Sequence, residues 1–146
     1  MTNVLNSILI MIEQKEITLQ GYRRGYHLIT SQIVNSLDEL PDKGLLNVHV
    51  KHTSAGITLN ENADPSVRTD FHTFFDDMVP ENYRGFTHTL EGADDMPAHL
   101  KASIIGQSIT IPITGGRLNL GTWQGIYFCE FRNHAGTRKL VLTVYS

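Results

Sequence analysis

The order in which the hydrophobic pattern changes along the chain restricts the fold more than any other feature of this sequence. Two segments in the middle, residues 65–80 and the residues from Asp95 to Ile104, carry apolar residues at helical spacing. The last third alternates as strands do, over Ser108–Thr114, Arg117–Leu120, Gly125–Arg132 and Lys139–Tyr145. This order is typical of an α+β protein with a mostly antiparallel sheet and about three helices, not of a doubly wound parallel fold. No internal repeat or long linker is visible, so residues 1–146 are expected to form one domain.

The first third is expected to begin with an extended segment over Ser7–Leu19 and a turn over Gly21–Gly25. A helix should follow, capped by Thr30 and stopped by Pro41 and Gly44, with Ile33, Val34, Leu37 and Leu40 on one side. Strands are then expected over Leu45–His52 and Gly56–Asn60. In the first of these, Leu46, Val48 and Val50 share one face with His52, so His52 should point inward and His49 outward.

The two middle helices have recognisable starts. Asp64 and Pro65 supply an N-cap and a first helical residue, and the apolar positions that follow are Val67, Phe71, Phe74, Phe75 and Met78. Residues 82–95 lack a period and are predicted to form a loop. The second helix should open at Asp95, with Met96, Leu100 and Ile104 as its apolar stripe and His99 inside that stripe.

Charge and cysteine content exclude several classes of protein. The net charge is −3, from 12 basic and 15 acidic residues, which argues against a general binder of nucleic acid or acidic membranes. No stretch approaches the roughly 20 apolar residues of a membrane span, and no secretory signal is expected. The single cysteine, Cys129, excludes an internal disulfide and fits a reduced, cytoplasmic setting. Cys129 alternates with Tyr127 and Phe131, so a buried thiol is expected.

Seven histidines are the unusual part of the composition, and two segments place them among carboxylates. The first runs from His52 to Asp64, where His52 is either a base or ligand near Glu61 and Asn62, or a backbone-bonded structural residue. The second runs from His88 to His99 and encloses Glu91, Asp94 and Asp95. Imidazoles and carboxylates are ligands for Zn²⁺ or Mn²⁺, but this spacing is not a standard zinc pattern. The alternative is that the aspartates start a helix and His99 packs in the core.

The remaining candidates are weaker when taken alone. Thr114–Gly116 and Gly121–Gly125 could hold an anion, but hairpin glycines with Trp123 in the core are the simpler interpretation. Glu130 and Arg132 share a strand face and could form a plain ion pair. His72 and His134 are expected at the surface, and His27 in a loop.

Taken together, these segments resemble the YjbQ-like family, also described as the secondary thiamine-phosphate synthase enzyme family. The most specific stretch is Ser108-Ile-Thr-Ile-Pro-Ile-Thr-Gly-Gly116, continuing to Gly121-Thr122-Trp123-Gln124-Gly-Ile126. His52-Thr-Ser-Ala-Gly, Asn60-Glu-Asn-Ala-Asp64 and Asp94-Asp-Met-Pro-Ala-His-Leu-Lys101 also match. The resemblance spans nearly the whole chain, without a departure at a matched position.

The resemblance implies a single α+β domain that assembles as a homotrimer, with sites between subunits. It also implies a weak transferase activity that couples hydroxymethylpyrimidine diphosphate to a thiazole phosphate, releasing pyrophosphate. On that basis His88 and His99 are expected to bind a divalent metal, Zn²⁺ or Mg²⁺/Mn²⁺, with Asp94 or Asp95. His52, Glu61, Asn62 and Glu91 are the catalytic candidates, and Lys101, Thr122, Gln124 and Arg132 are expected to contact a phosphorylated small-molecule substrate.

Two other functions stay open from the residues alone. One is a metal-dependent hydrolase or phosphatase that uses an activated water. The other is a trimer that binds a ligand without catalysis. The sequence gives no dense cluster of cations for a diphosphate, which agrees with a weak synthase activity.

Overall fold

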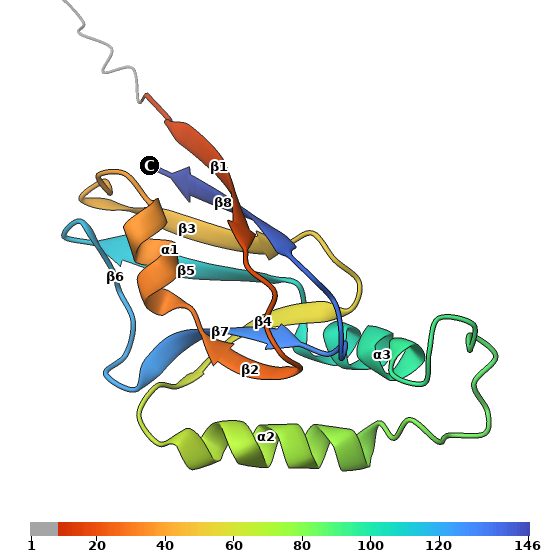
Figure 1. Ribbon diagram of the computed structural model, residues 1–146. Coiled ribbons are helices and arrows are strands. Elements are labelled where there is room, and N and C mark those ends of the chain that lie inside the picture. Colours follow the sequence, from red (N-terminus) through yellow and green to blue (C-terminus); the bar gives the residue numbers. More distant parts are fainter. Residues whose placement is uncertain (1–8) are drawn as a thin grey trace, which may run out of the picture.

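Two antiparallel sheets and three α-helices make up residues 9–146, the part of the chain that the computed structural model describes (Figure 1). The five-stranded sheet has the order β1-β8-β3-β5-β6, and the three-stranded sheet the order β2-β7-β4. The strands are β1 (Ile12–Leu19), β2 (Gly25–Leu28), β3 (Lys43–Val50), β4 (Ala55–Glu61), β5 (Ser108–Thr114), β6 (Arg117–Leu118), β7 (Gln124–Glu130) and β8 (Arg138–Tyr145). The helices are α1 (Thr30–Ser36), α2 (Pro65–Met78) and α3 (Asp95–Ile105). The α+β class and the antiparallel pairing are confirmed.

The three-stranded sheet lies between two cores because its middle strand, β7, is buried on both faces. Ile126 and Phe128 pack toward the five-stranded sheet, in the larger core. Tyr127 and Cys129 pack on the opposite side, against α2 and α3. Cys129 is fully buried, as predicted, and this burial raises the pKa of its thiol.

The first third differs from the prediction in two places. β2 occupies residues that were predicted to form a turn and a loop, so His27 lies in a strand. This strand is short and its hydrogen bonds come from β7, which the local sequence does not reveal. The helix α1 begins at Thr30 instead of being capped by it, and the Thr30 Oγ1 accepts a hydrogen bond from the Ile126 backbone N–H at 2.9 Å. The part of the predicted extended segment before Leu9 lies outside the described residues.

The start of α2 is confirmed, and its outer side is open. The Asp64 carboxylate caps the helix by accepting a hydrogen bond from the Ser66 N–H at 2.9 Å. Phe71 and Phe75 pack against Tyr26, but Phe74 remains 65% exposed. The helix therefore covers the sheet with only part of its apolar side.

The buried side of α3 is not the one predicted. Ile104 of the expected stripe is 55% exposed, whereas Ala98, Lys101 and Ala102 are buried. Small side chains bring the helix close to β4, where a Cβ on Gly56 would lie 2.9 Å from the Gly106 carbonyl oxygen. Close packing thus outweighed the hydrophobic pattern, and it placed the charged groups of Asp95 and Lys101 inside.

The remaining strands follow the prediction, and each of their ends lies within two residues of the expected one. Leu46, Val48 and Val50 are buried and His49 is exposed, as their alternation indicated. β3 ends at Val50, two residues before His52. Trp123 is 63% exposed, so its predicted place in the core is wrong. It lies in the loop before β7, from which Leu120 and not Trp123 packs against the larger core. Within residues 9–146, no helix has the length and apolar character needed to cross a membrane.

Candidate metal centre

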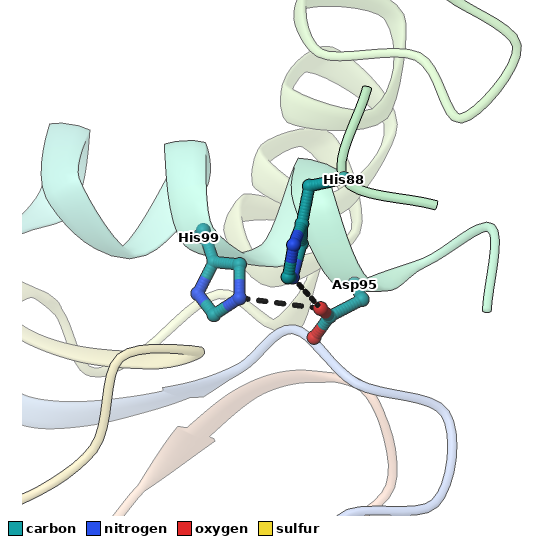
Figure 2. A group of neighbouring side chains, drawn as sticks. All are labelled: His88, Asp95 and His99. Carbon is teal, nitrogen blue, oxygen red and sulfur yellow. Dashed lines mark hydrogen bonds and ion pairs between the residues drawn. The ribbon is translucent and has the colours of Figure 1, made fainter. Parts of the chain in front are cut away.

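His88, Asp95 and His99 bring three potential ligand atoms together at the start of α3 (Figure 2). Asp95 is the first residue of the helix, and His99 lies one turn later on the same side. His88 reaches the same point from the preceding loop. Asp95 Oδ2 lies 2.7 Å from His88 Nε2 and 3.2 Å from His99 Nε2.

The three side chains differ in their access to solvent. Asp95 is only 1% exposed, while the side chains of His99 and His88 are 30% and 49% exposed. The carboxylate therefore forms the floor of the group, and the imidazoles form an open rim. An open rim leaves room for a further ligand, as catalytic metal sites require.

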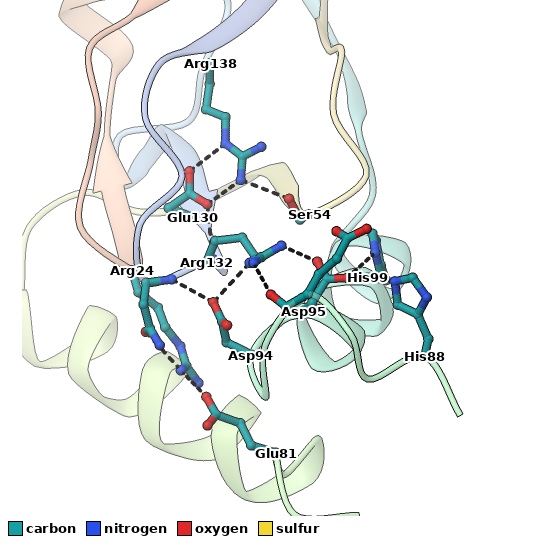
Figure 3. A network of polar contacts seen from close by, with 12 residues as sticks. Arg24, Ser54, Glu81, His88, Asp94, Asp95, His99, Glu130, Arg132 and Arg138 are labelled. Atoms are coloured by element: carbon teal, nitrogen blue, oxygen red, sulfur yellow. Dashed lines mark hydrogen bonds and ion pairs between the residues drawn. The ribbon is translucent and has the colours of Figure 1, made fainter. Parts of the chain in front are cut away.

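Arg132 fixes the floor of the site from the other side (Figure 3). Its Nη1 bonds Asp95 Oδ1, and its Nε donates to Asp94 Oδ2 at 3.0 Å. Its Nη2 donates to the Glu91 carbonyl oxygen at 2.9 Å. A guanidinium that spans two carboxylates holds Asp95 so that Oδ2 is left to face the histidines.

Asp94 is held in the same network but does not face the imidazoles. Its Oδ2 also accepts the backbone N–H of Asn133 at 2.9 Å. Burial alone would raise the pKa of Asp94, but the Asn133 N–H and the Arg132 guanidinium hold this pKa below its usual range. Asp94, Asp95 and Arg132 together carry one excess negative charge when the histidines are neutral, which favours a cation.

The hydrogen bond at the far side of His99 determines what its Nε2 can do. His99 Nδ1 lies 3.0 Å from the Thr53 carbonyl oxygen, which can only accept, so Nδ1 carries a proton. In the neutral ring, Nε2 then presents a lone pair toward the Asp95 carboxylate, which is also an acceptor. Two acceptors 3.2 Å apart require a proton or a cation between them. A histidine that donates Nδ1–H to a carbonyl is the usual outer support of a metal ligand, so these residues fit a divalent metal.

A second charged pair, Glu130 and Arg138, lies nearby and is closed to solvent. Glu130, fully buried, accepts from Arg138 Nε at 2.8 Å and from Arg138 Nη2 at 2.6 Å. Arg138 Nη2 also donates to Ser54 Oγ at 2.9 Å, and the Arg132 backbone N–H donates to Glu130 Oε1 at 3.1 Å. The predicted Glu130–Arg132 ion pair is therefore wrong. β7 ends at Glu130, so Arg132 is free of the strand and turns toward the aspartates.

His52 lies beside this closed pair and outside the His88–Asp95–His99 group. Its Nε2 accepts the backbone N–H of Lys139 at 2.8 Å, the first backbone group after Arg138. Burial and the nearby Arg138 charge lower the pKa of His52. The ring is thus engaged as a neutral acceptor.

Two of the expected catalytic residues, Glu61 and Asn62, and two of the expected substrate residues, Thr122 and Gln124, lie at the opposite end of the three-stranded sheet. Glu61 pairs with Gln124 at that end, whereas Ala55 pairs with Glu130 at the end near the His88–Asp95–His99 group. Six residue steps at roughly 3.3 Å each separate the two ends by about 20 Å. Asn62 Nδ2 donates to the carbonyl oxygens of Thr122 and Gln124, at 3.4 and 3.2 Å. The Asn62 side chain therefore holds the loop before β7, and within one chain the residues at this end do not reach the histidines.

Two further expected residues have other surroundings. The Lys101 Nζ is buried and bonds Asp76, so it does not reach the rim formed by the histidines. Only the backbone carbonyl of Glu91 enters the network, and its side chain is exposed. Two contacts were not predicted: that of the Thr53 carbonyl with His99, which no residue type signals, and the pairing of Asp76 with Arg24 and Lys101.

The fold and this group define a single-domain α+β protein with a candidate His–Asp–His metal site. The profile of the family described as UPF0047 protein YjbQ-like matches residues 15–146. UPF0047 protein YjbQ of Escherichia coli O157:H7 is 47% identical, over 90% of this chain and 96% of its own length. Its counterpart in Salmonella typhimurium is 50% identical, with the same coverage. The chain belongs to the YjbQ-like UPF0047 family.

Solved structures give the same result for the fold. An uncharacterized protein of the yjbq/upf0047 family from Clostridium acetobutylicum has a TM-score of 0.76 at 36% identity, covering 89% of this chain and 98% of its own. A YbjQ-like protein of unknown function from Sulfolobus solfataricus has a TM-score of 0.81 at 24% identity, covering 94% and 99%. The second likeness concerns the fold alone.

Proposed function

We propose that this protein is a metal-dependent enzyme that acts on a phosphorylated small molecule at His88, Asp95 and His99. The observation that carries the proposal is the pair of facing ligand atoms, His99 Nε2 and Asp95 Oδ2, 3.2 Å apart beside His88 Nε2. Two imidazoles and a carboxylate suit Zn²⁺ or Mn²⁺ better than Mg²⁺, which prefers oxygen ligands. The reaction to test first is the one implied by the family resemblance, formation of thiamine phosphate with release of pyrophosphate.

The residues of this chain have separate parts in such a reaction. A bound divalent ion would stabilise negative charge on the departing diphosphate. Arg132 is a positioning residue, because its Nε holds Asp94 and its Nη1 holds Asp95. Asp95 orients His99 from one side, and the Thr53 carbonyl orients it from the other. His88, the most exposed of the three, lies where a substrate would enter.

The position of Thr122 and Gln124 supports a site that is shared between copies of the chain. Their side chains are exposed at one end of the three-stranded sheet, about 20 Å from the end near the histidines, and next to the exposed Trp123. In a ring of identical chains, a head-to-tail contact joins one patch of each copy to a different patch of the next, so such a contact would unite the two sets if it joined the two ends of the sheet. We therefore propose a cytoplasmic homotrimer whose neutral donors come from one subunit and whose metal ligands come from the next.

A hydrolase or phosphatase is the second candidate, and one observation favours it. Lys101 and Arg132, the cations expected to hold a diphosphate, are engaged by Asp76 and by the two aspartates. The half-exposed His88 leaves the site open to water. A ligand-binding trimer without catalysis would leave both reactions absent.

The experiment measures bound metal and product in the same samples. We expect about one zinc or manganese ion per chain in the wild type, and loss of most of it in His88→Ala and in His99→Ala. Pyrophosphate release from hydroxymethylpyrimidine diphosphate and thiazole phosphate should fall with the metal, and chelation should abolish it. Parallel assays with phosphate esters decide between transfer and hydrolysis.

His49→Ala is the matched control, because His49 is exposed and lies on the outer face of β3. This variant should keep both metal and activity. Metal content that is unchanged in His88→Ala and His99→Ala would rule out the ligand assignment. Metal binding without either reaction would leave only the ligand-binding function.

A further inference from the structure

An open cleft of about 660 Å³ lies beyond Asn133, outside the His88–Asp95–His99 group. Its walls come from the turn before β2, from α2 and from the loop between β7 and β8. The lining residues are Arg23, Arg24, His72, Asp76, Asn133 and His134. The wall is therefore rich in groups that donate hydrogen bonds to anions.

The carboxylate in this wall is already neutralised. Asp76 Oδ1 lies 2.5 Å from Arg24 Nη2 and also bonds the buried Lys101 Nζ. Arg24 makes a second ion pair with Glu81 at 2.6 Å. Three cations, counting Arg23, thus face two carboxylates, which leaves one excess positive charge before either histidine is protonated.

Several donors around the cleft have no partner in residues 9–146. Neither the Arg23 guanidinium nor the His134 imidazole takes part in an ion pair or a side-chain hydrogen bond there. The Nε of Arg24 is buried and also lacks a partner. Arg23 and His134 are exposed to solvent, but a buried donor without an acceptor, such as Arg24 Nε, is uncommon in folded proteins, and an anion would supply the missing acceptor.

A short chain of contacts joins the cleft to the candidate metal centre (Figure 3). Arg24 Nη1 lies 3.4 Å from Asn133 Oδ1, and the Asn133 N–H donates to Asp94 Oδ2 at 2.9 Å. Asp94 in turn bonds Arg132, which holds Asp95. Asn133 therefore lies between the two sites and contacts a residue of each.

We propose that this cleft is a second binding site, for a diphosphate-type anion held by the side chains of Arg23, His134 and Arg24. Its assignment to the diphosphate of the substrate or product rests on the function proposed above. The binding of the anion itself needs neither the metal nor that function. Within residues 9–146, the cleft supplies one guanidinium without an ion pair, Arg23, which the His88–Asp95–His99 group lacks.

The test titrates inorganic pyrophosphate into metal-free protein by calorimetry, in buffer of about 0.15 M ionic strength, so that general surface attraction is screened. We expect saturable binding in the wild type. Arg23→Ala should weaken it by about tenfold or more, the loss expected for one charge-assisted contact to phosphate. His134→Ala should weaken it less, because a ring nitrogen offers a single hydrogen bond where a guanidinium can offer two. Both side chains lie outside the cores, so neither change should affect folding.

Arg117→Ala is the matched control, because it removes one exposed positive charge from β6, on the other sheet. It should bind pyrophosphate as the wild type does. Absence of saturable binding, or equal weakening in Arg117→Ala and Arg23→Ala, would overturn the proposal. Pyrophosphate binding that requires metal and His99, and that ignores Arg23, would also overturn it while supporting the metal-centred function.

Discussion

Two charged groups lie at the same end of the three-stranded sheet, and they differ in how completely they are satisfied. In the first, Glu130 and Arg138 form two hydrogen bonds with each other, with Ser54 and a backbone N–H completing the shell. In the second, Asp95 has one oxygen held by Arg132 and the other facing two imidazole nitrogens. Both carboxylates are almost fully buried, but only the second group has an exposed rim.

The difference separates stability from binding. A buried pair whose donors and acceptors all have partners has nothing left to offer a ligand, and breaking it leaves an uncompensated charge. A buried carboxylate that faces lone pairs is incomplete until a cation or proton arrives. We infer that the Glu130–Arg138 pair stabilises this end of the three-stranded sheet, and that the His88–Asp95–His99 group stays open to bind a ligand.

The largest effect should come from breaking the closed pair. Arg138→Met should lower the free energy of unfolding by about 3–5 kcal/mol, because Glu130 would remain buried without a counter-charge. Urea denaturation at fixed protein concentration measures this. The double variant Glu130→Leu/Arg138→Met should recover most of the loss. A cost below about 1 kcal/mol for the single variant would show that the pair is hydrated and not closed.

The next effect should come from filling the open group. Zinc at a hundred times its dissociation constant should raise the free energy of unfolding of the wild type by about 2.7 kcal/mol, since it binds only the folded chain. His99→Ala should show little of this gain, and its stability without metal should be close to that of the wild type. Thermal unfolding with and without metal compares them. An equal gain in both proteins would place the zinc elsewhere.

The smallest effect should be a pH dependence that belongs to His52. Its pKa is lowered in the folded chain by burial and by Arg138, so the neutral ring is favoured there. The stability from the neutral ring is complete above the ordinary pKa of about 6.5, and it is lost as the pH falls below that value toward the folded pKa. The loss should be smaller than the two effects above, because the ring is only partly buried and solvent screens its charge.

Comparing the unfolding free energy of the wild type and His52→Gln from pH 7 down to pH 5 isolates this contribution. The glutamine oxygen can still accept the Lys139 N–H but does not titrate. The difference between the two proteins should narrow toward acid pH. Parallel curves would mean that His52 does not couple to folding.

Much of the fold was predictable because it depends on local patterns. The alternation of Leu46, Val48 and Val50, the Asp64 cap and the buried Cys129 are all as expected. β2 and the buried side of α3 were not predictable in the same way. Each depends on a partner distant in sequence, β7 in one case and β4 in the other.

For the candidate site, the sequence by itself singled out the segment from His88 to His99 and its pairing of imidazoles with carboxylates. Only the tertiary structure decided that Asp95 faces the histidines while Asp94 turns to Arg132 and Asn133. It also placed Thr53 behind His99 and separated Gln124 from the histidines. The reason is physical: residue type sets which bonds a side chain can make, but packing of α3 against β4 sets which partners it meets.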